Sequence, residues 1–232
     1  MKYLALWLEA PLQSWGSNSK FGRRDTEIFP TKSGIYGLIL SAMGKQGPQD
    51  DFLARLSSLR QYIIAYSYNT HTKPDILMDF HMVGSGYDAS APWERLLIPK
   101  KADGTPAVGG GSKITYRYYL QDVSFGVIQE MHEDFENDVS HALQFPVYDL
   151  FLGRKNCVPT EFIYRGCFNS FDEAKEVLDS LKNDKGLKKI YTVEEVNEAS
   201  PESLIISDVP LQFGDSKMYK ERIVLISHDD EY

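Results

Sequence analysis

The stretch that most constrains the fold is residues 26–44, TEIFPTKSGIYGLILSAMG, where a polar loop turns at Pro30 and continues as an apolar segment. The apolar residues of this segment recur at the spacing of one helix face: Ile35, Leu38, Ile39 and Ala42. This spacing predicts a helix whose apolar face packs in the core. Ser33 is the predicted N-cap, because its hydroxyl can accept a hydrogen bond from a free N–H of the first turn.

The start of this helix also carries the residues of a candidate anion site. Unpaired N–H groups at a helix N-terminus attract anions, and Lys32 would add a positive charge beside them. Gly34 and Gly37 lack a side chain and would let a phosphate or another backbone approach closely. The alternative is an ordinary capped core helix with Lys32 in solvent, and the stretch by itself leaves both interpretations open.

Composition sets broad limits on the class of protein. The chain has 232 residues, of which 42% are hydrophobic and 25% charged, as in soluble globular proteins of one elaborated domain or two small ones. We find no stretch long enough to cross a bilayer, and two cysteines do not make a secreted disulfide framework, so we expect a cytoplasmic protein with no membrane partner. The net charge of −8 argues against indiscriminate binding to nucleic acid. Residues 1–60 nevertheless carry eight basic and five acidic side chains, and an anionic ligand would prefer them.

The periodicity of the chain predicts a mixture of strands and helices. Strands are expected at 3–9, 61–68, 76–82, 113–128, 188–196, 204–207 and 222–227, and further helices at 50–59, 130–143 and 171–184. The order strand, helices, strand, strand is how a ferredoxin-like or RNA-recognition-type (RRM) domain begins. We therefore expect an α+β fold, with helices on one face of an antiparallel sheet and additional C-terminal strands. In the first strand, the leucine side (Leu4, Leu6 and Leu8) is expected to be buried.

The loop after the first strand and the segment that follows it carry polar, aromatic and basic residues. Gln13 offers a hydrogen-bonding amide, and Trp15 offers a ring for stacking. Arg23 and Arg24 follow in a polar segment, and basic residues beside an aromatic would suit a nucleic-acid backbone. The alternatives are that Trp15 packs at the edge of the core and that the basic segment is a solvated loop.

Residues 84–112 interrupt the regular pattern with a stretch rich in glycine and proline. Loops of this length are usually functional or disordered, and the apolar residues within this one favour a projecting β-hairpin or arm. At its base, Arg117 lies among tyrosines and could hold a phosphate, or could form a cross-strand ion pair. His81, at the root of the arm, is the one histidine that we consider as a general acid or base, unless it simply closes a strand.

A third basic segment is the turn FLGRKNCVP at residues 151–159. Gly153 permits a tight turn that would point Arg154 and Lys155 outward. The sequence contains no recognisable pattern of a metal site, a phosphate-binding loop or a serine nucleophile. We therefore expect neither a metal nor another cofactor.

Together these segments resemble the CRISPR-associated Cas family-five subunit of the type I-E Cascade, a guide-RNA surveillance complex. The resemblance covers most of the chain and is clearest in four places: LQSWG at 12–16, PTKSGIYGLILSAMG at 30–44, the segment from DFHMVG to TYRYYLQDVSF at 79–125, and FLGRKNCVP at 151–159. Each motif by itself is moderately specific. Their occurrence together, in this order and at this spacing, is much more specific than any one of them.

The resemblance implies a single elaborated ferredoxin-like palm over residues 1–232, with a thumb inserted at about 84–112. Such a subunit caps the foot of the complex and grips the 5′ handle of the CRISPR RNA (crRNA). It implies a non-catalytic subunit for crRNA-guided DNA targeting in antiviral defence. Its partners would be crRNA, the backbone subunit beside the thumb, the large subunit, and target DNA through the complex. With the neighbouring polar residues described above, the expected RNA-binding set is Gln13, Trp15, Arg23, Arg24, Lys32, Ser33, Gly34, His81, Arg117, Gly153, Arg154 and Lys155.

The competing function is a metal-independent endoribonuclease that processes the CRISPR repeat RNA. In a related Cascade type, the family-five subunit cuts the repeat with a tyrosine, a lysine and a histidine. The lysine–histidine pair is missing here at the expected place, because His81 follows Phe80. In type I-E a different subunit performs the processing, so binding without catalysis is the preferred interpretation.

Overall fold

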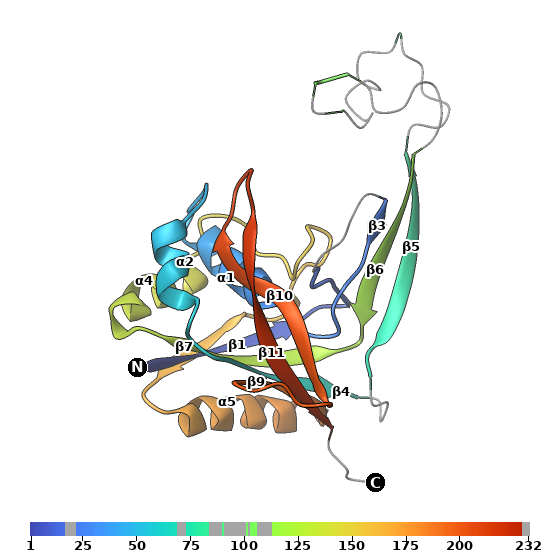
Figure 1. The fold of residues 1–232 in the computed structure, drawn as a ribbon. Coiled ribbons are helices and arrows are strands. Elements are labelled where there is room, and N and C mark those ends of the chain that lie inside the picture. The colour runs from blue at the N-terminus through green and yellow to red at the C-terminus, as the bar shows by residue number, and fades with distance from the viewer. Residues whose placement is uncertain are drawn as a thin grey trace.

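The computed structural model describes residues 1–16, 22–68, 73–83, 90, 101, 103–105 and 113–228. Most of the expected thumb, 84–112, lies outside the described residues, so its shape stays a prediction. The described residues form a large antiparallel sheet with helices on both faces, and a smaller sheet whose two longest strands project from the body (Figure 1).

The large sheet has seven strands in the order β10-β11-β9-β4-β7-β1-β8, and every neighbouring pair is antiparallel. Its strands are β1 Lys2–Glu9, β4 Gln61–Ser67, β7 Ser124–Met131, β8 Tyr164–Phe168, β9 Lys188–Val196, β10 Ser203–Gln212 and β11 Met218–His228. The expected α+β architecture is confirmed. The short strand β8 has no counterpart among the sequence predictions.

Two hydrophobic clusters lie on opposite faces of this sheet. On one face, Leu4, Leu6 and Leu8 pack with α1 (Lys32–Ala42), α2 (Asp50–Leu56) and α4 (Glu136–Gln144). On the other face, Ala5 and Trp7 pack beneath α5 (Phe171–Asp184), and both are fully buried (Figure 1). The leucine face is buried as predicted, but the expectation of helices on one face only is wrong, since α5 covers the second face.

Helix α5 has the bounds that its sequence pattern predicts, because its start is fixed by local contacts. Ser170 and Glu173 form a capping box, in which each side chain accepts a hydrogen bond from the other residue's backbone N–H. The helix lies close to the sheet at Gly126, where an added Cβ would meet Leu178 Cδ1 at 2.9 Å. Glycine at this position of β7 therefore sets how closely α5 packs.

Helix α1 begins two residues earlier than the sequence suggests. The N-cap is Thr31, whose side chain accepts a hydrogen bond from the N–H of Gly34 at 3.2 Å, so the prediction that Ser33 is the N-cap is wrong. The Ser33 hydroxyl instead lies 3.3 Å from the Thr31 hydroxyl in the first turn. The apolar face is in the core as expected, with Ile35, Leu38, Ile39 and Ala42 all buried.

The segment expected as one long strand at 113–128 is broken into two strands of different sheets. β6 (Lys113–Gln121) is followed by Asp122, which adopts a left-handed conformation with φ of 51°, and β7 begins at Ser124. The helix expected at 130–143 also begins later. Its first residues complete β7, and a 3₁₀ turn at Glu133–Phe135 precedes α4.

The smaller sheet is built around β6. β5 (Asp75–Val83) pairs along the whole length of one edge of β6, and the short strands β2 (Leu12–Gln13) and β3 (Arg23–Arg24) pair with the other edge. β5 and β6 extend away from the body and lead towards residues 84–112 (Figure 1). Among the residues described, no helix is long and apolar enough to span a bilayer.

Candidate functional site

A cleft of about 990 Å³ brings together many of the candidate residues, and we call it the α1 cleft. It lies between the first turn of α1, the β2–β3 region, the turn at 151–159 and the hairpin of β10 and β11. Its lining residues are Ser14, Trp15, Gly16, Arg24, Asp25, Thr31, Ser33, Gly34, Gly153, Arg154, Ser207, Phe213, Lys217 and Tyr219. The sequence prediction named six of these: Trp15, Arg24, Ser33, Gly34, Gly153 and Arg154.

One wall of the cleft is formed by Trp15, which is only 1% exposed. Its indole N–H donates to the side-chain oxygen of Gln13 at 3.1 Å, and the Gln13 amide donates to the carbonyls of Leu8 and Val123. An added Cβ on Gly34 would lie 2.8 Å from the indole, so Gly34 is required for Trp15 to lie against α1. Gln13 is fully buried, and it shapes the cleft rather than facing it.

A second wall is the turn that contains Gly153 and Arg154. Gly153 has a φ of 95°, and an added Cβ would lie 1.7 Å from the Ser14 carbonyl oxygen, so this position can hold only glycine. Arg154 donates to the carbonyls of Tyr118 at 3.1 Å and Arg24 at 2.8 Å, which ties the turn to both β6 and β3. Its guanidinium also lies over the Tyr119 ring, 4.7 Å from the centroid. Arg154 therefore holds this wall of the cleft in place and adds positive charge to the cleft.

The start of α1 binds an anion that belongs to the chain itself. The Lys32 backbone N–H donates to Asp208 Oδ2 at 2.7 Å, and Asp208 is 1% exposed on β10. The Gly34 and Ile35 N–H groups are taken by Thr31. The sequence predicted that N–H groups at this helix N-terminus are free to bind an anion. This prediction is wrong for the N–H groups of Lys32, Gly34 and Ile35, because each donates to a group of the chain itself.

The Lys32 side chain is fully buried and does not line the cleft. Its ammonium lies 2.8 Å from Glu195, which also accepts from Arg222 at 2.9 Å. Arg222 forms a two-contact ion pair with Asp208, with both distances 2.7 Å. Burial lowers the pKa of Lys32, and the nearby Glu195 opposes this effect. These four charged residues lock α1 to the three C-terminal strands.

The cleft carries more positive than negative charge. Arg24 and Lys217 are exposed and join Arg154, whereas Asp25 is the one carboxylate among the lining residues. The Asp25 carboxylate accepts two hydrogen bonds from Arg23 Nε, at 2.8 and 3.0 Å, and Arg23 itself lies over the Tyr118 ring. Charged guanidinium and ammonium groups beside aromatic rings suit single-stranded nucleic acid.

The C-terminal wall of the cleft was missed by the sequence prediction. Phe213, Lys217 and Tyr219 come from the hairpin of β10 and β11, which folds against the turn at Pro48 through a hydrogen bond from Phe213 N–H. Two aromatic residues and a lysine within seven residues are the signal that could have indicated a binding hairpin.

Besides Gln13, Arg23 and Lys32, three more candidate residues lie outside the lining of the cleft. Lys155 is exposed on the turn beside Arg154, and Arg117 and His81 lie on β6 and β5. Arg117 stands opposite Asp79 in the strand register, as a cross-strand pair would require, but the Asp79 carboxylate lies 2.5 Å from His81 Nε2. Among the described residues, no group of three or more His, Cys, Asp or Glu side chains could hold a metal.

Comparison with known proteins gives the family. Residues 3–225 match the family described as CRISPR-associated protein (Cas_Cas5). The chain belongs to this family. It is 28% identical over 185 residues to "CRISPR system Cascade subunit CasD" of Escherichia coli (strain K12), which covers 76% of each protein.

Solved structures share the fold of this Cas5 family member. A chain of a "CRISPR RNA-guided surveillance complex" aligns with a TM-score of 0.70 at 23% identity, covering 97% of this chain and 89% of that one. A "Crystal structure of Cas protein" aligns with a TM-score of 0.63 at 23% identity, covering 97% and 94%. The family expected from the four sequence motifs is confirmed by the family match over residues 3–225.

Proposed function

We propose that this Cas5 family protein is a non-catalytic subunit of a type I-E Cascade and that the α1 cleft binds the 5′ handle of the crRNA. The observation that carries this proposal is the meeting of Arg24, Arg154 and Lys217 with the rings of Phe213 and Tyr219 around one cleft. Cationic groups bind the phosphates of a single strand, and aromatic groups stack on its bases.

The candidate residues divide into two roles under this proposal. The exposed cations and the Ser33 hydroxyl contact the RNA directly, with Arg23 and Lys155 at the rim. The buried residues Gln13, Trp15 and Lys32, together with Gly34 and Gly153, give the cleft its shape. Arg117 and His81 extend the RNA path along the projecting strands β5 and β6, towards residues 84–112.

The proposed partners follow from the same assignment. The relative from Escherichia coli is described as a Cascade subunit. We propose that residues 84–112 form a thumb beside the backbone subunit, that the large subunit docks nearby, and that target DNA is reached through the assembled complex. The cytoplasm is the compartment in which such a complex would meet crRNA.

The experiment that tests RNA binding uses the full chain and a fluorescently labelled crRNA with its 5′ handle, over a series of salt concentrations. The double variant Arg24→Glu/Lys217→Glu should weaken binding at least about tenfold. It should also reduce the slope of log affinity against log salt by about 1.4, since each lost contact to a single strand removes about 0.7. Lys188→Glu, an exposed lysine at the start of β9 that does not line the cleft, is the matched control.

Equal affinity and equal slope for the double variant and the control would refute the assignment of the cleft. The same RNA is analysed on a denaturing gel without metal ions, to test the endoribonuclease alternative. Intact RNA supports the non-catalytic role. A discrete cut 5′ of the handle that disappears in His81→Ala would make the chain the processing nuclease instead.

A further inference from the structure

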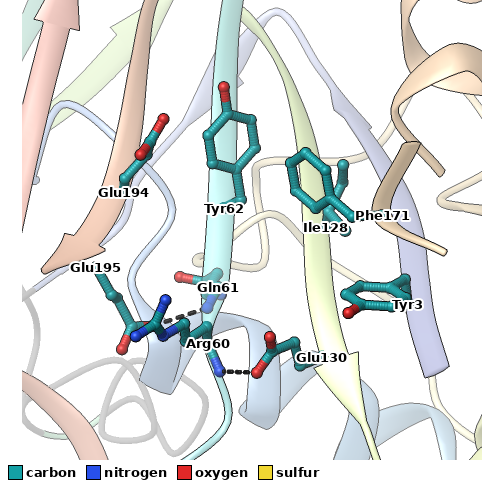
Figure 2. A pocket seen from close by; sticks show the side chains of 9 residues that line it. All are labelled: Tyr3, Arg60, Gln61, Tyr62, Ile128, Glu130, Phe171, Glu194 and Glu195. Carbon is teal, nitrogen blue, oxygen red and sulfur yellow. Dashed lines mark hydrogen bonds between the residues drawn. The ribbon is translucent and has the colours of Figure 1, made fainter. Parts of the chain in front are cut away.

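A second concave site lies on the α5 face of the large sheet, where the start of α5 leaves the strands uncovered. We call it the Tyr62 groove. It has a volume of about 340 Å³ and is lined by Tyr3, Arg60, Gln61, Tyr62, Ile128, Glu130, Phe171, Glu194 and Glu195 (Figure 2). None of these residues lines the α1 cleft, so the groove is a separate surface.

The floor of the groove is aromatic. Phe171, the first residue of α5, stands edge-on to Tyr3 and Tyr62, with interplanar angles of 80° and 81° and centroid distances of 6.3 and 5.1 Å. Burial raises the pKa of the Tyr62 hydroxyl, with Glu194 adding to the effect, so Tyr62 stays a neutral phenol. The three rings form one continuous apolar surface across β1, β4 and the start of α5.

Carboxylates stand at both ends of this aromatic floor. Figure 2 shows Glu194 beside Tyr62 at one end and Glu130 below Tyr3 at the other. Glu130 accepts a hydrogen bond from the Arg60 backbone N–H at 2.8 Å, and Glu194 is exposed and stands opposite Tyr62 in the strand register. Glu195 contributes no free charge, because Lys32 and Arg222 already pair with it.

Three basic side chains lie near the groove. Arg60 lies between Glu195 and Glu130, at the end of the groove away from Glu194, and its guanidinium donates to the side-chain oxygen of Asn197 at 3.4 Å (Figure 2). Lys189 and Lys175 act on the Tyr62 hydroxyl from nearby, and the Lys175 ammonium pairs with Asp179 at 3.0 Å. Of the residues that line the groove, the charged one that stands beside Tyr62 is Glu194.

We propose that the Tyr62 groove binds an arginine side chain of a protein partner. A guanidinium is planar and can stack on the face of the Tyr62 ring while its N–H groups donate to Glu194. The carboxylates disfavour the phosphates of a nucleic acid, since like charges repel. A basic segment of a protein can present such an arginine as its anchor.

This inference does not rest on the RNA-binding proposal, because the two sites share no lining residue. It assigns the α5 face of the protein to a protein contact and the α1 cleft to RNA. An assembled complex would then hold the chain from two sides.

The test is a nuclear magnetic resonance titration of the full chain with N-acetyl-arginine amide, monitoring the aromatic resonances of Tyr3, Tyr62 and Phe171. We expect saturable shifts with a dissociation constant in the millimolar range, since one stacked ion pair is weak on its own. Glu194→Gln should weaken binding about threefold to tenfold, and Tyr62→Leu should weaken it at least as much. Glu202→Gln, an exposed acid at the start of β10, is the matched control.

N-acetyl-glycine amide and inorganic phosphate serve as probes of the other chemistries. Shifts produced equally by the glycine compound, or binding of phosphate at the same resonances, would overturn the proposal. Shifts by the arginine compound that persist in Glu194→Gln would also overturn it, and because Glu194 is exposed this variant is expected to fold normally. In the assembled complex, Glu194→Arg should reduce the amount of this subunit that copurifies with its partners while leaving handle RNA affinity unchanged.

Discussion

The buried ion network behind the α1 cleft makes a quantitative prediction for Asp208→Ala. Asp208 is 1% exposed and makes three contacts of 2.7 Å, two to Arg222 and one to the Lys32 backbone N–H. Its removal leaves a guanidinium that is 7% exposed without its main counter-ion, and leaves one helix N–H unpaired. Breaking a buried pair by removing one partner costs about 3–5 kcal/mol.

The assay is equilibrium unfolding in urea, followed by far-ultraviolet circular dichroism. With a denaturant slope of about 2–3 kcal/mol/M, the loss lowers the unfolding midpoint by about 1–2 M. This is a large part of a total stability of about 5–15 kcal/mol. Asp215→Ala, which removes an exposed carboxylate between β10 and β11, is the control and should change the free energy of unfolding by less than about 0.5 kcal/mol.

A loss below about 1 kcal/mol for Asp208→Ala would refute the reasoning, because it would mean that Arg222 is satisfied by Glu195 and Gln61 alone. RNA affinity measured under folding conditions then separates the two consequences of the change. If Asp208 also orients the start of α1, the folded fraction of the variant should bind handle RNA more weakly than the wild type.

Three further predictions follow from packing, titration and exposed apolar surface. Gly153→Ala should destabilise the protein by more than about 2 kcal/mol in the same urea assay, because the new Cβ would clash with Ser14 at a left-handed backbone position. The free energy of unfolding should fall as pH rises above about 10, by about 1.4 kcal/mol per pH unit for each buried tyrosine. The reason is that burial keeps these tyrosines protonated in the folded state, whereas tyrosine in the unfolded chain ionises near pH 10. Absorbance at 295 nm checks that they ionise only when the protein unfolds. The tyrosines concerned are Tyr36, Tyr66 and Tyr191. One face of β5 and β6 exposes an apolar stripe (Ile76, Met78, Phe80, Met82, Ile114 and Tyr116), so the isolated chain should self-associate on size-exclusion chromatography, and Met78→Ser/Phe80→Ser should reduce this.

Elements fixed by local contacts could be predicted from the sequence, and α5 shows why. Its capping box and its amphipathic pattern lie within residues 170–184, so both ends of the helix are visible without knowledge of the fold. The break after β6 carried a weaker signal. Aspartate tolerates the left-handed conformation that Asp122 adopts, but the surrounding β-branched and aromatic residues favoured one continuous strand.

The residues that form the α1 cleft and the wall behind it could be predicted only in part, because long-range contacts bring them together. Thr31 and Ser33 are both suitable N-caps. The first turn of the helix is held by Asp208, which accepts a hydrogen bond from the Lys32 backbone N–H and lies 176 residues after Lys32 in the chain. Lys32 has the sequence context of an exposed cation, and only the register of β9 and β11 brings Glu195 and Arg222 to it. The hairpin that supplies Lys217 was predicted as separate strands, with no indication that it folds over α1.

The net charge of −8 and an RNA ligand are compatible because the fold separates the charges. At physiological ionic strength a charge is felt over about 8 Å, so the local set of groups matters more than the sum over the chain. Five of the acids lie within residues 130–138, at the end of β7 and around α4, and none of these lines the α1 cleft. The cleft has three cations against Asp25, which Arg23 already neutralises. Affinity for handle RNA should therefore depend strongly on salt, while the acidic remainder of the surface disfavours binding of long nucleic acid anywhere else.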